Sequence, residues 1–320
     1  MYRIPDRIKH FAVLASTAGL PKPLRIAART RLLSSFQLAK ARRADVLVIV
    51  HPKSGGTWFR VMLSRLYQMK YGLPARQIVK SDELYNRNHS LPRFLFTNGH
   101  YTYEGTVKEF FKGGGPGPDF DRKKAIFLAR HPCDVAVSWY LQFTKRISAH
   151  KKELINHTLE HPVRRDEISM WDFVTHEELG LPALIEFLNA WERDISRMSH
   201  GLIVRYEDLR THPEATLKRV TDFIGEGFTD DEIQEAVDFA SFDNLRKLEH
   251  ANYFRNSGMS LINANDPDTF KVRRGKVGGY RDYFTAEQVA QMEDMVRTRL
   301  SPALGYAESG IGLGKVADEG

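Results

Sequence analysis

The residues best placed to do chemistry lie in a short glycine-containing stretch. The segment His51-Pro-Lys-Ser-Gly-Gly-Thr57 holds two glycines, one lysine and two hydroxyl groups. It follows the β-branched apolar run 45–50 and precedes residues 58–67, whose apolar side chains recur at helical spacing. Glycines let backbone N–H groups approach an anion, a helix start adds partial positive charge, and Lys53 supplies a full charge. The pattern indicates a phosphate-binding loop between a strand and a helix.

The order of these residues argues against an ordinary ATPase. The Walker pattern places its lysine after the glycines, whereas Lys53 precedes Gly55 and Gly56. Glycines also end strands for steric reasons, so the loop by itself leaves a purely structural role open. Lys-Ser-Gly-Gly-Thr-Trp instead resembles the 5′-phosphosulfate loop of the sulfotransferases, usually written K-S-G-T-T-W.

An arginine and a serine follow a second apolar run, residues 124–129. Arg130 at a strand end could bind a phosphate through two parallel hydrogen bonds, and Ser138 on the next helix could reach the same group. The structural alternative is that Arg130 pairs with Asp134 and Ser138 is merely packed. The segment is similar to the sulfotransferase 3′-phosphate motif, and this resemblance implies that Arg130 and Ser138 hold the 3′-phosphate of the nucleotide.

Aromatic residues are the candidates for contact with the base, because stacking suits any flat purine. Residues 240–245 resemble the segment in which the family's phenylalanine stacks on adenine. The resemblance implies that Ser241 and Phe242 lie at the nucleotide and that Trp58 faces the base from the other side. It also implies a hydrogen bond from Tyr206 to an adenine nitrogen. Without the resemblance, Phe242 is interpreted as a core residue.

Residues 272–285 look like the family's C-terminal signature, R-K-G-x-x-G-D-W-K-x-x-F-T. Cations beside glycines form a loop with exposed backbone amides that suits an anion, and a solvated basic loop is the alternative. Gly279 and Tyr280 depart from the family pattern, which has an aspartate and a tryptophan there. The resemblance implies that three residues close over the 3′-phosphate: Arg273, Arg274 and Gly275.

His100 is the candidate base. It follows the short apolar run 94–97 and matches the histidine of the family's K-T-H, with Asn98 in place of the lysine. A histidine of pKa near 6.5 can accept a proton from a hydroxyl at neutral pH, and a structural histidine is the alternative. The predicted catalytic residues are Lys53, His100 and Ser138. The predicted nucleotide-binding residues are Lys53, Ser54, Gly55, Gly56, Thr57, Trp58, Arg130, Ser138, Tyr206, Ser241, Phe242, Arg273, Arg274 and Gly275.

Composition narrows the class of protein. The 320 residues are 42% hydrophobic and 27% charged, which is ordinary for a soluble globular protein. The single cysteine, Cys133, excludes an intrachain disulfide and suits a reducing, cytoplasmic location. A net charge of +7 suits an anionic ligand or surface, but no zinc-finger or RNA-binding motif supports a nucleic-acid partner. His157 and His161 are spaced like a helical metal pair but lack a third ligand, so we expect no metal.

Strands alternating with helices predict an α/β fold of a single domain. We expect a three-layer, P-loop-like arrangement with a mainly parallel central sheet flanked by helices. Residues 1–44 are predicted to form a helical segment that packs on the main domain at 45–306, and 307–320 to form a disordered tail. The charged stretch 146–170 is expected to be a mobile excursion over the site. No apolar run reaches the roughly 20 residues of a membrane span.

Residues 11–20 are apolar, follow basic residues and weakly resemble a signal peptide, but Ser16 and Thr17 interrupt the run, which favours an amphipathic helix that packs on the main domain. The family often dimerises near its C-terminal signature. Arg281 and Thr285 fit that dimer motif loosely, so a homodimer stays open.

Together the motifs resemble a sulfotransferase that uses 3′-phosphoadenosine 5′-phosphosulfate (PAPS) and releases adenosine 3′,5′-bisphosphate. The resemblance implies transfer of a sulfuryl group to a hydroxyl or amine by in-line displacement. A small-molecule kinase related to the P-loop enzymes and a non-catalytic binder of nucleotides or polyanions are the alternatives.

The acceptor is open between two classes of molecule. Basic residues at 145–165 would suit an anionic acceptor such as a glycan. A phenol, sterol or lipid-like alcohol would instead suit a pocket lined by aromatic residues, for which the candidates are Phe94, Phe96, Tyr101, Tyr103, Trp139, Phe143 and Tyr253.

Overall fold

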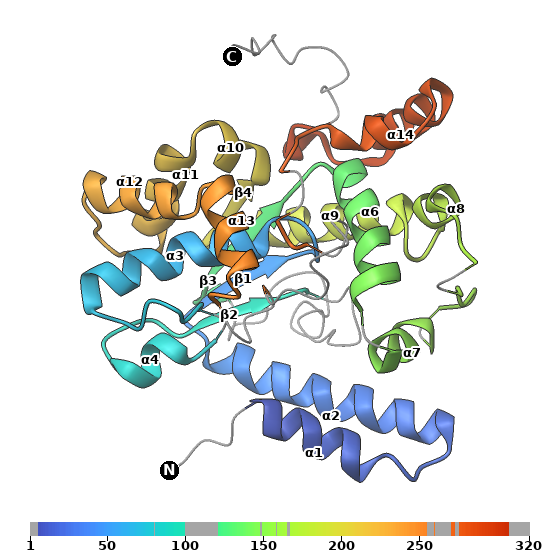
Figure 1. The fold of residues 1–320 in the computed structure, drawn as a ribbon, viewed down its shortest axis with the longest axis horizontal. Coiled ribbons are helices and arrows are strands. Elements are labelled where there is room, and N and C mark those ends of the chain that lie inside the picture. Colours follow the sequence, from blue (N-terminus) through green and yellow to red (C-terminus); the bar gives the residue numbers. More distant parts are fainter. Residues whose placement is uncertain are drawn as a thin grey trace.

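The centre of the molecule is a sheet of four parallel strands in the order β2-β1-β3-β4 (Figure 1). This computed structural model describes residues 6–79, 81–99, 121–147, 149–157, 159–164, 167–254, 259, 270–272 and 275–306. The strands are β1 (Val46–Val50), β2 (Phe94–Thr97), β3 (Lys124–Ala129) and β4 (Gly201–Arg205). The prediction of a parallel central sheet is therefore confirmed.

Side chains that alternate along the strands divide the core into two layers, as expected where both faces of a sheet are covered. Leu47 and Phe127 belong to a cluster with helices α6 (Pro132–Leu141), α9 (Leu181–Ile195) and α14 (Ala286–Arg299). Val48 and Ile126 face the opposite way. They pack with α3 (Gly56–Tyr71), α11 (Pro213–Ile224), α12 (Asp230–Phe239) and α13 (Phe242–His250). The fold has the three layers that the sequence predicts.

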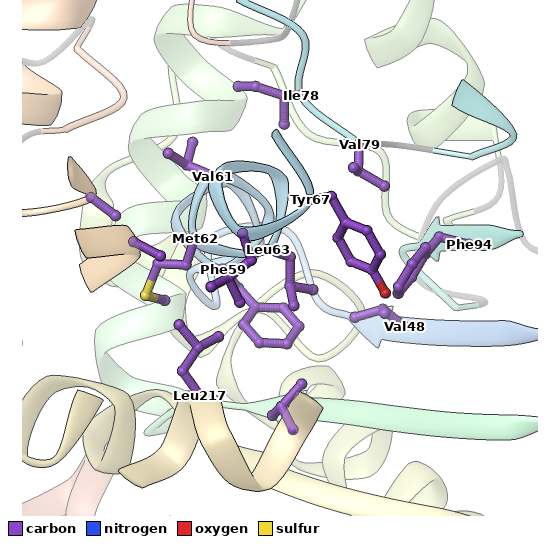
Figure 2. Packing of buried hydrophobic residues seen from close by; sticks show 14 of the residues in the cluster. Val48, Phe59, Val61, Met62, Leu63, Tyr67, Ile78, Val79, Phe94 and Leu217 are labelled. Atoms are coloured by element: carbon purple, nitrogen blue, oxygen red, sulfur yellow. The ribbon is translucent and has the colours of Figure 1, made fainter. Parts of the chain in front are cut away.

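Helix α3 is held against the sheet by large buried side chains. Tyr67 packs edge-on against Phe94 of β2, with ring centroids 5.8 Å apart. Figure 2 shows this pair, and it shows Met62 of the same helix beside Leu217 of α11. Phe59 and Met62 are fully buried, so the helix is fixed along its length and its first turn is held at a defined place beyond β1.

The register of the strands brings the loops of interest to one edge. Ile49 of β1 lies beside Thr97 of β2, and Val50 lies beside Leu128 of β3. Ala129 lies beside Arg205 at the end of β4. Because the strands are parallel, the segments that follow them meet at the carboxyl edge of the sheet, where ligands bind in open α/β folds.

The stretch 146–170 contains more regular structure than a mobile excursion. A π-helix at Gln142–Arg146 continues from α6, α7 spans Ala149–His157, and α8 spans Met170–Thr175. Leu154 is fully buried with Trp139 and Phe143, which gives α7 an apolar face to bury. Smaller helices include α4 (Glu83–Arg87) between α3 and β2 and α10 (Tyr206–Thr211) directly after β4.

Two further helices, α1 (Asp6–Ser16) and α2 (Lys22–Arg43), lie side by side at one edge of the molecule (Figure 1). Val13, Ile26 and Leu33 join the cluster that contains Trp139 and Phe143. In the part of the chain that the structure describes, none of the helices is both long enough and apolar enough to cross a membrane. The predicted tail at 307–320 lies outside the described residues.

Candidate active site

The loop between β1 and α3 has an unusual backbone. Lys53 adopts φ of 79° and Gly55 adopts φ of 91°, both in the left-handed region. Alternation of left-handed with right-handed residues turns successive amide N–H groups toward one concavity, which is an anion-binding arrangement. The first turn of α3 adds N–H groups that have no partner within the helix. The loop is therefore built to bind a negative group.

Close contacts explain both glycines of the loop. A Cβ atom on Gly55 would lie 2.5 Å from the ring of Tyr206, and one on Gly56 would lie 2.9 Å from Cγ2 of Val50. Gly55 also needs its positive φ, which side chains with a Cβ rarely adopt. The loop thus packs against the ends of two strands with no space for a larger residue.

Arg130 connects this loop to the rest of the site. Its Nη1 atom donates a hydrogen bond to the carbonyl of Lys53 at 3.1 Å, and its guanidinium lies 4.3 Å from the ring centroid of Tyr206. The predicted structural alternative is present as well, because Nη2 lies 3.7 Å from the carboxylate of Asp134. The Nε atom is buried and has no hydrogen-bond partner among the described residues. Arg130 therefore stabilises the loop through the carbonyl of Lys53, and its Nε–H group could still donate a hydrogen bond to a ligand.

Asp134 attaches the C-terminal signature to α6. Its buried carboxylate accepts hydrogen bonds from the amides of Gly278, at 2.8 Å, and Tyr280, at 3.1 Å. Tyr280 stacks on the ring of His131 with centroids 5.4 Å apart. Burial lowers the pKa of His131 to about 4, so this ring is neutral at pH 7. The positive charge near this ring comes from Arg281 and Arg130.

The predicted base-binding aromatics come together from distant segments. Trp58 donates a hydrogen bond through Nε1 to the carbonyl of Ala240 at 2.8 Å, and its ring meets that of Tyr206 edge-on at 5.5 Å. Phe242 rests on the signature loop, because a Cβ atom on Gly275 would lie 2.9 Å from its ring. All of these aromatic side chains border one cavity of about 450 Å³, a volume typical of small-molecule sites.

The cavity collects most of the predicted site residues that the structure describes. Ser54 is fully buried with its Oγ atom unpartnered among the described residues, and it is not part of the cavity wall. Ser241 is exposed at the start of α13 and is not part of the wall either. His100, Arg273 and Arg274 lie outside the described residues. The predicted residues in the wall are Lys53, Gly55, Gly56, Thr57, Trp58, Arg130, Ser138, Tyr206, Phe242 and Gly275.

Residues next to His100 are described and lie at the cavity. Asn98, two residues before it, is part of the wall. Gly99 has φ of 64°, and a Cβ atom there would lie 2.7 Å from Nε1 of Trp191. The chain therefore leaves β2 through a tight turn beside the cavity.

Comparison with known proteins identifies the family. The model of the sulfotransferase domain matches residues 43–303, which is most of the chain. The chain belongs to the sulfotransferase family.

Curated relatives of this sulfotransferase match it over most of their length. Cytosolic sulfotransferase 13 of Arabidopsis thaliana is 26% identical over 282 residues, covering 84% of this chain and 81% of the relative. Flavonol 3-sulfotransferase of Flaveria bidentis is 25% identical over 294 residues, covering 84% and 86%.

Solved structures share the fold of this sulfotransferase. Mouse sulfotransferase SULT7A1 complexed with PAP has a TM-score of 0.52 at 19% identity, covering 83% of this chain and 87% of that one. Retinol dehydratase in complex with androsterone and the inactive cofactor PAP has a TM-score of 0.53 at 19% identity, covering 82% and 84%.

The predicted site residues leave out five cations in the cavity wall of this sulfotransferase, and three of them are Arg60, Lys151 and Lys271; the others are Arg210 and Lys276. Arg60 lies one helical turn after Gly56, and that spacing could have placed it on the same face of α3. Lys151 depends on α7, which was not predicted. Asp134 was considered only as a partner of Arg130. In the described part of the chain, no group of three or more His, Cys, Asp or Glu side chains is arranged to hold a metal ion.

Replacing Gly55 with alanine tests the close approach of the loop to Tyr206. We expect Gly55→Ala to lower the free energy of unfolding by about 1–2 kcal/mol for the left-handed backbone and by about 1–3 kcal/mol more for the clash. Gly72→Ala is the matched control, because Gly72 has φ of 62° but a Cβ atom there would have no neighbour within 4 Å. Urea denaturation measures the free energy of unfolding of both variants. Equal losses in the two variants would contradict the proposed contact.

Proposed function

We propose that this protein transfers a sulfuryl group from PAPS to a hydroxyl or amine of an acceptor. One observation carries the proposal: a strained, lysine-bearing anion loop shares a cavity with a second anion-type site and with aromatic side chains. The second site is formed by Arg130 and Ser138, and the aromatics are Trp58, Tyr206 and Phe242. Two anion sites flanking an aromatic surface fit a nucleotide with phosphates at both its 3′ and 5′ positions.

The residues present fit such a nucleotide in physical terms. Gly55 and Gly56 let the loop backbone pack against Tyr206 and Val50, where a Cβ would clash, and the Nε atom of Arg130 is a buried donor unpartnered among the described residues. We propose that the amides of 55–57 and the hydroxyl of Thr57 hold the 5′-phosphate. The amide of Ser54 already donates to the carbonyl of His51 at 3.1 Å. Arg130 and Ser138, with Arg273, Arg274 and Gly275, would hold the 3′-phosphate.

The reaction requires little from the protein beyond positioning and charge. PAPS supplies the sulfuryl group when it is bound. We propose that His100 takes the proton of the acceptor hydroxyl as its oxygen forms a bond to sulfur. The bond from sulfur to the bridging oxygen breaks, and the ammonium of Lys53 neutralises the charge that develops on that oxygen. Such stabilisation acts strongly in a site that excludes water.

The order of residues in the loop separates this proposal from the kinase alternative, since a Walker lysine follows the glycines. The names of the relatives support a cytoplasmic location.

We also propose that residues 1–44 form a helical segment that packs on a main domain at 45–306, and that the protein forms a homodimer. Within one chain, Arg281 already pairs with Glu293, and Thr285 caps α14.

Calorimetric titration with adenosine 3′,5′-bisphosphate, without metal, tests the nucleotide class. We expect binding of the bisphosphate and a weaker response to adenosine 5′-monophosphate. In Ser138→Ala the ratio of the affinity for the bisphosphate to that for the monophosphate should fall by about tenfold, because one hydrogen bond to a charged group contributes about 1.5–3 kcal/mol. A preference for ATP with Mg²⁺ would favour the kinase alternative. Failure of all three nucleotides to bind would overturn the proposal.

We propose that the acceptor carries a negative group. Arg60, Lys151 and Lys271 line the cavity in addition to the residues assigned to the nucleotide. Arg60 lies over the ring of Phe96 at 5.5 Å, and its Nε atom donates to the carbonyl of Val79. Apolar wall residues such as Trp139 and Ile155 would contact the uncharged part of the molecule. The predicted pocket residues Phe94 and Phe143 are instead core residues, while Tyr101 and Tyr103 lie outside the described chain.

The carboxylate that acts on Lys271 is already hydrogen-bonded to backbone amides. Glu249 is fully buried and accepts hydrogen bonds from the amides of Lys271, at 2.6 Å, and Val272, at 2.8 Å. Burial and the positive charges of Arg146, Arg60 and Lys151 lower the pKa of Lys271 to about 8, although Glu249 opposes this. A second anion entering with the acceptor would relieve the repulsion among the cations.

Lys53→Ala should reduce turnover much more than nucleotide affinity. Removing a charge that acts on the leaving oxygen costs about 10²–10³ in kcat, as for other preorganised donors. The affinity for adenosine 3′,5′-bisphosphate should change by less than about tenfold, since the loop amides remain. Steady-state kinetics and calorimetry measure the two effects, with the exposed Lys218→Ala as control. Equal losses would make Lys53 a binding residue only.

His100→Ala should lower transfer to an alcohol by about 10²–10⁴, the usual contribution of a general base. Nucleotide affinity should be unchanged, because the proposed role concerns only the acceptor proton. His200→Ala is the control, since His200 is an exposed histidine in the turn before β4. A near-normal rate for His100→Ala would exclude it as the base.

Lys271→Met tests the charge of the acceptor. In the wild type, KM for an acceptor with a carboxylate or sulfate should rise as the pH rises through about 8, because Lys271 loses its proton there. The variant should show a KM raised about tenfold or more at pH 7 and no such step. Neutral phenols should be unaffected. A matching loss of bisphosphate affinity would assign Lys271 to the nucleotide instead.

A further inference from the structure

Large apolar side chains are exposed on the two N-terminal helices and the turn between them. Phe11 of α1 is 71% exposed, and Leu24 of α2 is 60% exposed. Every exposed large hydrophobic residue of the described chain lies in this segment: Ile8, Phe11, Leu20, Leu24 and Leu32. A concentration of exposed apolar side chains in one helical hairpin indicates an interaction surface rather than ordinary surface composition.

Helix α1 has an apolar side toward the body of the protein and a second one toward the outside. Val13 is buried against α2 and the cluster around Trp139. On the other side, Ile8, Phe11 and Ala15 recur at i, i+3 and i+7, and all are exposed. A helix covered on only one side normally carries charged residues on the other. Within the described part of the chain, the outward face of α1 is therefore left uncovered.

The positive charge of the whole chain comes from this same segment. Residues 7–44 hold nine lysines and arginines and no aspartate or glutamate. The rest of the chain holds 38 lysines and arginines against 40 aspartates and glutamates. Lys22, Arg31 and Arg42 are exposed. Without residues 7–44, the formal net charge of the chain would therefore be slightly negative.

The helical pair is attached firmly to the body. Arg25 of α2 pairs with Glu153 of α7 at 2.6 Å. Arg29 donates through Nε to Oγ1 of Thr17 at 2.9 Å, which joins the two helices. Ile26 is almost completely buried in the cluster with Trp139. The outer face of the pair is thus presented in a fixed orientation at one edge of the molecule (Figure 1).

We propose that α1 and α2 form a docking surface for an anionic lipid bilayer. Exposed apolar side chains would enter the boundary between headgroups and acyl chains, while the flanking cations would lie near lipid phosphates. In this arrangement the protein binds to the surface of the membrane, so no membrane-spanning helix is required. A second copy of the chain fits less well, because a symmetric contact would bring two such cationic segments together without acidic partners.

Co-sedimentation of the full chain with vesicles tests this proposal. We expect binding to vesicles of phosphatidylcholine with phosphatidylglycerol, weaker binding to phosphatidylcholine alone, and loss of binding at high salt. Phe11→Ser should weaken binding about tenfold or more, from the lost burial of one large apolar side chain. The double variant Arg31→Glu, Arg42→Glu should abolish the preference for the anionic lipid.

The double variant Arg297→Glu, Arg299→Glu on α14 is the matched control for charge, because both arginines are exposed and α14 lies at the opposite edge from α1 and α2 (Figure 1). Binding of adenosine 3′,5′-bisphosphate should be unchanged in all variants, which shows that each is folded. The proposal is overturned if the wild type fails to sediment with anionic vesicles or if Phe11→Ser sediments as well as the wild type. A dimer in light scattering that Phe11→Ser dissociates would assign this face to a second copy.

Discussion

The loop between β1 and α3 is held in a conformation that its own sequence disfavours. Lys53 adopts a left-handed backbone, which costs about 1–2 kcal/mol for a residue with a Cβ atom. Residues far away in the chain stabilise this conformation: Arg130 binds the carbonyl of Lys53, and Tyr206 packs against Gly55. The sheet supplies both, because they follow β3 and β4. The anion site therefore depends on correct assembly of β1, β3 and β4.

Two buried carboxylates play similar parts on either side of the signature arginines. Glu249 accepts the amides of residues 271 and 272, and Asp134 accepts the amides of residues 278 and 280. A buried charge is costly unless it is hydrogen-bonded, and each carboxylate here receives a pair of amide donors. The chain on both sides of residues 273–274 is thereby fixed to α13 and α6. Two loop flanks with little regular structure gain a defined position over the cavity.

Local pattern was sufficient for the fold and for much of the cavity. Strands β1, β2 and β3 are short apolar runs, and their predicted boundaries agree with the structure to within one residue because burial on both faces leaves a continuous apolar signal. The sequence placed the loop with Gly55 and Gly56 and the side chain of Arg130 directly after strands, and Ser138 on the helix that follows. Parallel strands then bring such ends to one edge. The sequence by itself determined the α/β class and the phosphate-type loop.

Tertiary structure decided what no local pattern contains. Arg60, Lys151 and Lys271 come from three distant segments, and only packing brings them to one wall. α7 was missed because its short apolar face becomes evident only against Trp139 and Phe143. Ser241 adjoins Phe242 in sequence but is exposed at the start of α13 and outside the wall, since successive residues at a helix start point in different directions. Contacts between residues far apart in the chain are not encoded in spacing, and these contacts fix the cavity's charge.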